Sequence, residues 1–146
     1  MRRVLVFASV VAGCSGGPSS GSTTGTDGIA ATCGDADTSV VEGTLDGKPA
    51  NVTGTTKSWS WVNIGNPSRY DGSFEGGSIH LEWSGTTPNG RVTPVTIATV
   101  TLDANAGTRT FQSGSLLYDS PDDESILKTT LTFDTGTVTV CMRKSD

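Results

Sequence analysis

Residues 127–142 read LKTTLTFDTGTVTVCM, and this stretch decides the fold. Polar and apolar side chains alternate on both sides of Asp134–Gly136, with large apolar groups at Leu127, Leu131, Phe133, Val138, Val140 and Met142. An alternation with a period of two indicates strands that bury one face. A short link that contains glycine favours antiparallel pairing of the two flanking strands. The end of the chain is therefore predicted to form a β-hairpin.

The same pattern recurs towards the N-terminus. Ile79, Leu81 and Trp83 alternate with His80 and Glu82. Trp59 and Trp61 are predicted to share one strand face, and further strands are expected near residues 40–45, 50–53, 92–102 and 108–118. Turn sequences separate several of these runs, at Asp46–Gly47, Asn89–Gly90 and Asp103–Gly107.

Helical periodicity is nearly absent from the chain, so the sequence predicts an all-β protein. Eight or nine strands with one apolar face each must cover one another to leave water. We expect an antiparallel β-sandwich. A closed or partly open antiparallel barrel is the alternative.

The first fourteen residues have a different character. Two arginines, Arg2 and Arg3, precede the apolar run Val4–Val11, which is shorter than the roughly 20 residues that a membrane-spanning helix needs. Val11-Ala12-Gly13-Cys14 resembles the lipobox of bacterial lipoprotein precursors. The resemblance implies that residues 1–13 are a signal peptide and that the thiol of Cys14 carries a diacylglyceryl group. An ordinary secretory peptide with a chance cysteine is the alternative.

The predicted lipid determines where the mature protein would be located. Two acyl chains hold a protein firmly at a bilayer, whereas a single chain binds reversibly. We therefore expect attachment to the cell envelope through the lipid. Ser15 follows the cysteine where an aspartate often retains lipoproteins at the inner membrane, so the resemblance favours the outer membrane.

The chain after the predicted cleavage site divides into two parts. Residues 14–32 contain the lipidated cysteine and a stretch dominated by Gly, Ser and Thr, which is typical of a flexible linker. Residues 33–146 have the size of one ordinary domain, and they hold the predicted sandwich.

Charge and cysteine content exclude some partners. Without residues 1–13, eight basic and fifteen acidic side chains remain, a formal net charge of −7. This acidic excess argues against nucleic acid, whose binding requires a basic surface. With Cys14 assigned to lipid, Cys33 and Cys141 remain at the two ends of the domain. Exported proteins meet an oxidising compartment, so these two cysteines are predicted to form a disulfide.

Two groups of side chains are candidates for a site. Trp59 and Trp61 offer neighbouring rings that could stack on a sugar, although large aromatic side chains also fill cores. His80 and Glu82 project from one strand face about 6.6 Å apart along the strand. Neither residue has an evident third ligand or buried pocket nearby, so a solvated face is the expected interpretation. We assign no metal and no cofactor.

No set of catalytic residues is recognisable in the sequence. The sequence therefore favours a non-catalytic binding or structural module of the envelope, with a glycan or another envelope protein as its partner. The alternative is a small envelope hydrolase that uses carboxylates such as Asp71, Glu75 or Glu82 in a surface cleft. That alternative rests on analogy with other enzymes of sandwich fold.

Overall fold

The computed structural model describes residues 28–121 and 123–146. Within these residues every regular element is a β-strand, and all strand pairs are antiparallel, which confirms the predicted all-β class. The described part of the chain contains no helix with the length and apolarity needed to cross a membrane. The predicted signal peptide, the lipobox with Cys14 and most of the predicted linker lie outside the described residues.

Ten strands form one continuous sheet. In chain order they are β1 (Thr38–Leu45), β2 (Lys48–Pro49), β3 (Val52–Val62), β4 (Ser68–Phe74), β5 (Gly77–Trp83), β6 (Val92–Pro94), β7 (Ile97–Leu102), β8 (Phe111–Asp119), β9 (Glu124–Phe133) and β10 (Gly136–Ser145). Their spatial order is β6-β8-β9-β10-β1-β3-β4-β5-β7, and β2 pairs separately with β1. The two outermost strands of this order, β6 and β7, are not paired with each other, so the described sheet is not closed into a barrel.

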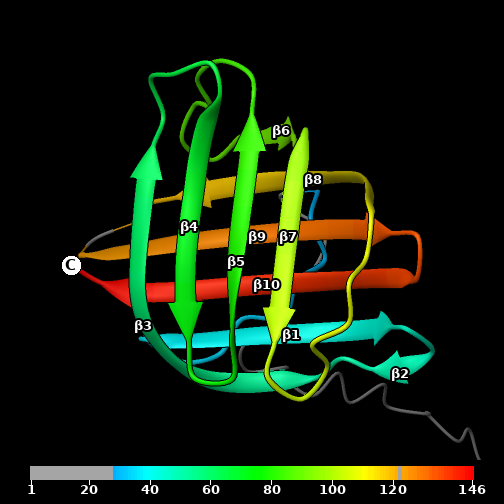
Figure 1. Ribbon diagram of the computed structural model, residues 1–146. Coiled ribbons are helices and arrows are strands. Elements are labelled where there is room, and N and C mark those ends of the chain that lie inside the picture. Colours follow the sequence, from blue (N-terminus) through cyan, green and yellow to red (C-terminus); the bar gives the residue numbers. More distant parts are fainter. Residues whose placement is uncertain (1–27, 122) are drawn as a thin grey trace, which may run out of the picture.

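The sheet folds over on itself at β3. The start of β3 (Val52–Thr55) pairs with β1, whereas its remainder (Thr56–Val62) pairs with β4, with a bulge between Thr56 and Ser58. Figure 1 shows the result: β3, β4, β5 and β7 form a front layer whose strands cross those of a back layer formed by β1, β8, β9 and β10. Strands that pass from one layer to the other through a bulge are typical of crossed sandwiches. The predicted sandwich is confirmed.

The core lies between the two layers. It is built from the inward side chains of the alternating runs, including the fully buried Leu45, Leu81, Trp83, Leu131 and Val138. Burial of this apolar surface is the main force that holds the layers together, at about 25 cal/mol per Å² removed from water. The predicted final hairpin is present, and β9 pairs with β10 from Gly136↔Phe133 to Ser145↔Glu124.

Two parts of the predicted strand pattern differ from the structure. The expected strand at 92–102 is divided into β6 and β7, which lie in different layers, because the chain turns between Pro94 and Ile97. No strand was expected at β4. Its inward positions are Ser68, Tyr70, Gly72 and Phe74, and a serine and a glycine on the buried face hide the alternation.

A short N-terminal segment covers the outer face of the back layer. Ile29 and Ala31 are each 1% exposed, and they pack with Cys33, Leu117 and Cys141 in a second, smaller apolar cluster. We call residues 28–34 the strap. Cys33 and Cys141 form the predicted disulfide, which joins the strap to β10. The packed part of the chain thus reaches Ile29, four residues before the domain boundary expected from composition.

Candidate functional site

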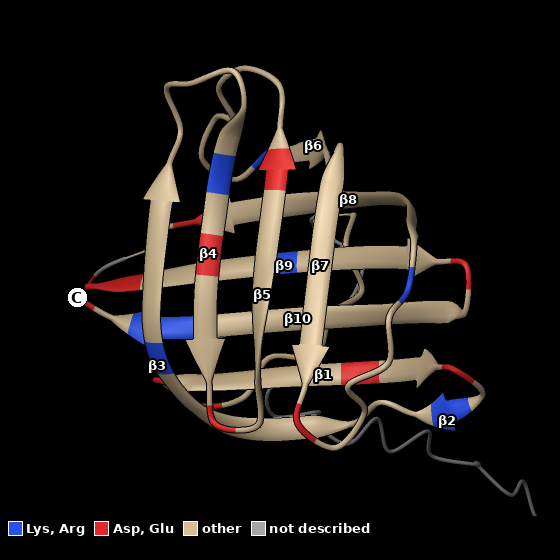
Figure 2. Ribbon diagram, in the orientation of Figure 1, with Lys and Arg blue, Asp and Glu red and all other residues tan. Residues whose placement is uncertain are grey.

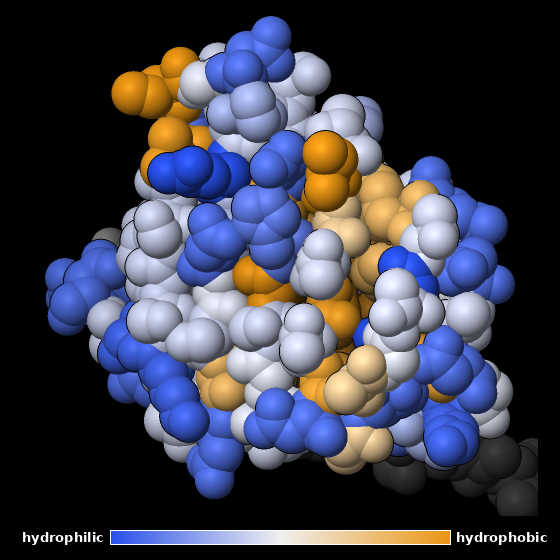
Figure 3. All heavy atoms as spheres, viewed as in Figure 1, coloured by the Kyte–Doolittle hydropathy of each residue, from blue (hydrophilic) through white to orange (hydrophobic). Residues whose placement is uncertain are grey.

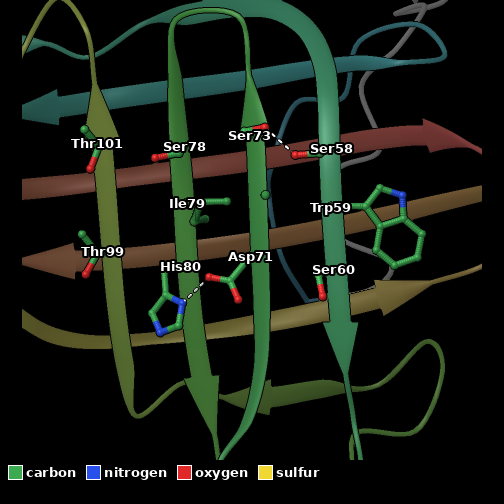
Figure 4. A pocket seen from close by; sticks show the side chains of 11 residues that line it. Ser58, Trp59, Ser60, Asp71, Ser73, Ser78, Ile79, His80, Thr99 and Thr101 are labelled. Carbon is green, nitrogen blue, oxygen red and sulfur yellow. Dashed lines mark hydrogen bonds and ion pairs between the residues drawn. The ribbon is translucent and has the colours of Figure 1, made fainter.

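An open groove runs over the outer face of the front layer. It has a volume of about 520 Å³ and is lined by residues of β3, β4, β5 and β7. Figure 4 shows the side chains of the residues that line it, and Figure 3 shows this face, where hydrophilic and weakly polar groups surround patches of apolar atoms. The strand register orders the lining into rows that cross all four strands, because residues opposite one another in paired strands share a face.

One row consists of small hydroxyl side chains. Its members, in order across the sheet, are Ser58, Ser73, Ser78 and Thr101. The hydroxyl oxygens of Ser58 and Ser73 lie 2.6 Å apart and share a hydrogen bond. Side chains of this size leave room above the sheet, and each hydroxyl can both donate and accept hydrogen bonds. We call this set the hydroxyl row.

The adjacent row carries the ionisable groups of the groove. It runs Ser60, Asp71, His80 and Thr99 across the same four strands. The His80 ring contacts carboxylates through both nitrogens: Nδ1 lies 2.5 Å from Asp71 Oδ1, and Nε2 lies 3.0 Å from Glu82 Oε1. Figure 2 places acidic residues on β4 and β5, and Figure 4 shows Asp71 and His80 turned towards each other. We call Asp71, His80 and Glu82 the carboxylate–histidine chain.

The surroundings of His80 favour its protonated form. Partial burial by itself would lower the pKa of His80, but the hydrogen bonds and charges of Asp71 and Glu82 outweigh it and raise the pKa above the usual value. An ionised carboxylate can only accept hydrogen bonds, so a ring with a carboxylate at each nitrogen bonds to both of them best when both nitrogens carry a proton. The arrangement therefore favours an imidazolium between Asp71 on β4 and Glu82 on β5.

The two predicted stacking residues are placed on the other face of β3. Trp59 and Trp61 are half-buried and pack against the core, and Figure 4 shows the Trp59 ring pointing away from the groove. The Trp61 ring stacks on Tyr118 with a centroid distance of 4.1 Å and lies 4.7 Å from Trp83. Trp59 is among the residues that line the groove, but its ring, like that of Trp61, packs against the core, so we do not propose either ring as a stacking surface for a ligand in the groove.

A second hollow, of about 360 Å³, lies beside β7 and is lined in part by Arg109. The Arg109 side chain is only 3% exposed, and it donates hydrogen bonds to Val100 O, Asp46 Oδ2 and Asn105 O. The bond to Val100 O occupies one carbonyl on the edge strand β7, and the bond to Asp46 lowers the pKa of that carboxyl. The Arg109 guanidinium thus joins the β7–β8 loop to the edge of β7 and the β1–β2 turn, which is a structural role.

Across residues 28–121 and 123–146, no group of three or more His, Cys, Asp or Glu side chains is arranged to hold a metal ion. The carboxylate–histidine chain does not qualify because its two carboxylates contact different nitrogens of one ring. Of its three members, sequence reasoning placed His80 and Glu82 on one face. It considered Asp71 as a separate carboxylate, because the pairing of β4 with β5 has no signal in the sequence.

Comparisons of the chain with protein-family models, with curated proteins and with solved structures gave no match. The function is therefore inferred from the side chains of the groove and from the position of the strap.

Proposed function

We propose that this protein is a non-catalytic, lipid-anchored module of the bacterial cell envelope that binds a neutral saccharide in the groove of its front layer. The observation that carries the proposal is the set of hydroxyl side chains that four strands present around Asp71 and His80. Saccharide hydroxyls both donate and accept hydrogen bonds, as serine and threonine hydroxyls do. Binding sites use a few well-placed polar groups of this kind to fix the orientation of a ligand.

The charges around the groove favour a neutral ligand. Asp71 and Glu82 contribute two formal negative charges, and His80 contributes one positive charge in its protonated form. Arg69 adds a second positive charge because it lies opposite Glu82 in the pairing of β4 with β5. The formal charges of these four side chains cancel, so neither a strongly anionic nor a strongly cationic ligand is attracted.

The geometry gives less support to a carboxylate hydrolase. In glycosidases the two carboxyl groups are separated by a gap that admits the scissile bond or a water molecule. Here the His80 ring occupies the space between Asp71 and Glu82 and bonds to both. Glu75 lies in the turn between β4 and β5 and does not line the groove.

The position of the strap supports display of the groove away from the membrane. The strap packs on the outer face of the back layer, and the groove lies on the outer face of the front layer. In Figure 1 the strap is seen behind β8 and β9, with the front layer between it and the viewer. The chain would therefore enter the domain from the side opposite the groove.

Saccharide binding can be tested with three neutral hexasaccharides: cellohexaose, maltohexaose and chitohexaose. Isothermal calorimetry on the purified full chain should detect binding of at least one. Ser78→Arg, which fills the groove, should abolish it, whereas Ser113→Arg on an exposed position of β8 should not. Absence of binding to all three sugars, or equal loss in both variants, would contradict the proposal.

Lipid anchoring is tested separately on the full chain. Cys14→Ser removes the thiol to which the lipid would be attached, so the protein should move from the membrane fraction to the soluble fraction after cell breakage. Immunoblots of the two fractions measure the change, and Ser15→Ala serves as the control that keeps the cysteine. Retention of the Cys14→Ser protein with the membrane would show that the anchor is something else.

A further inference from the structure

The carboxylate–histidine chain leaves one atom turned to the groove. Asp71 uses Oδ1 for the contact with His80, and within the described part of the chain its Oδ2 makes no hydrogen bond. The Asp71 side chain is 51% exposed, against 24% for Glu82. Asp71 also lines the groove and lies beside Ser60 in the strand register, whereas Glu82 lies outside the lining. The carboxylate–histidine chain thus presents Asp71, and not Glu82, to a ligand.

Glu82, at the other end of the carboxylate–histidine chain, fixes the orientation of His80 and thereby of Asp71. His80 Nε2 lies 3.0 Å from Glu82 Oε1, and this contact holds the ring in the plane that directs Nδ1 at Asp71; in the protonated ring both nitrogens donate. The charged groups that contact His80 are Asp71 from β4 and Glu82 from its own strand. Arg69 lies opposite Glu82 on β4, and the neighbour of His80 on β7 is the uncharged Thr99. A rigidly held acceptor loses less entropy on binding than a free side chain does.

We infer that Asp71 is the residue that selects the ligand of this groove, by accepting hydrogen bonds from sugar hydroxyls, and that Glu82 is a positioning residue that acts through His80. This inference rests on the proposed saccharide function. Hydrogen bonds to an ionised acceptor are roughly twice as strong as neutral ones, so a single carboxylate can dominate recognition in a groove of hydroxyls.

The variant Asp71→Asn tests the first part of the inference. It keeps the size of the side chain but replaces an ionised acceptor by an amide, so the affinity for the hexasaccharide bound by the wild type should fall roughly 10- to 100-fold. Ser73→Ala, which removes one neutral hydroxyl from the same groove, should cost about threefold or less. Both proteins are compared by calorimetry after their folds are checked by near-ultraviolet circular dichroism.

Glu82→Gln tests the positioning role through the pH dependence of binding. The affinity of the wild type should fall at alkaline pH, where His80 loses the proton that holds Asp71. Removing the Glu82 charge lowers the pKa of His80, so in Glu82→Gln this fall in affinity (the alkaline limb of the pH profile) should occur at lower pH. A purely structural effect would lower the affinity equally at all pH values.

The outcomes separate the two levels of the proposal. If Ser78→Arg abolishes binding while Asp71→Asn binds like the wild type, the saccharide site stands and Asp71 is not the selecting residue. An unmoved alkaline limb in Glu82→Gln would overturn the positioning role alone. If none of the three hexasaccharides binds the wild type, both the proposed function and this inference are overturned.

Discussion

The proton on His80 depends on two carboxylates from two strands, so it couples the fold to pH. The pKa of His80 is raised in the folded protein, since the stabilising contacts of Asp71 and Glu82 outweigh partial burial. A raised pKa means that the folded state binds the proton more tightly than the unfolded chain, whose histidine has a pKa of about 6.5. The contribution to stability is therefore complete below pH 6.5 and is lost as the pH rises through the folded value.

We predict that the stability lost in His80→Gln is larger at pH 6 than at pH 9, because the wild type has lost the imidazolium at the higher pH. Urea unfolding of both proteins at the two pH values measures the difference. The ring protons of His80 followed by NMR should titrate above the midpoint of a model peptide. The prediction would be contradicted by a loss of unfolding free energy in His80→Gln that is the same at both pH values, or by a His80 titration midpoint below that of the peptide.

The three residues of the carboxylate–histidine chain differ in how well their placement can be predicted from the sequence. Alternation alone places His80 and Glu82 on one face of β5, because residues two apart on a strand point the same way. Asp71 joins them through the pairing Asp71↔His80, which depends on the register between β4 and β5. Register is a property of two strands and their turn, so a pattern within one strand cannot give it.

At the scale of the element, the passage of β3 between layers is stabilised by a buried pair of hydroxyls. Thr56 is 4% exposed at the bulge and Ser39 on β1 is fully buried. Their side-chain oxygens lie 2.7 Å apart and share a hydrogen bond. Because water does not reach this position, each hydroxyl depends on the other for its partner.

We predict that Thr56→Val destabilises the protein by about 1–3 kcal/mol, because it leaves the Ser39 hydroxyl buried without a partner. Ser39→Ala should cost a similar amount. The double variant removes both polar groups and should cost clearly less than the sum of the two single variants. Urea denaturation of the four proteins measures the cycle, and strictly additive losses would show that the hydroxyls do not interact.

Turns were more predictable than strand boundaries. Asp46 and Gly47 have φ values of 55° and 71°, the left-handed conformation that the Asp-Gly sequence predicts for a tight hairpin. By contrast, β3 is a single strand across residues that looked like two, and Val92–Leu102 is two strands that looked like one. Turn chemistry is local to a few residues, whereas a strand that bends between layers is set by what each half packs against.

At the scale of the whole molecule, the strap and the disulfide join the start of the domain to its last strand. Cys33 and Cys141 are 108 residues apart in the sequence, and Cys141 is fully buried beneath the strap on the outer face of β10. The sequence predicted this disulfide from cysteine count and compartment alone. The burial of Ile29 and Ala31 was not predicted, because a Gly- and Thr-rich composition hides two apolar residues that find a partner surface only in the folded sheet.

We predict that the double variant Cys33→Ala/Cys141→Ala is less stable than the disulfide-bonded protein by about 2–5 kcal/mol, because a cross-link over this separation restricts the unfolded chain. Urea unfolding of the two proteins measures the difference.

Hydrogen exchange tests whether the disulfide also holds the strap in place. If the disulfide also holds the strap on the sheet, the amides of Ile29 and Ala31 should exchange faster in this variant than the global loss of stability explains. Leu117→Ala, which weakens the surface beneath the strap but keeps the cross-link, is the matched control and should accelerate these amides less. Strap amides that follow the global stability in the disulfide variant would show that the disulfide acts only on the unfolded chain.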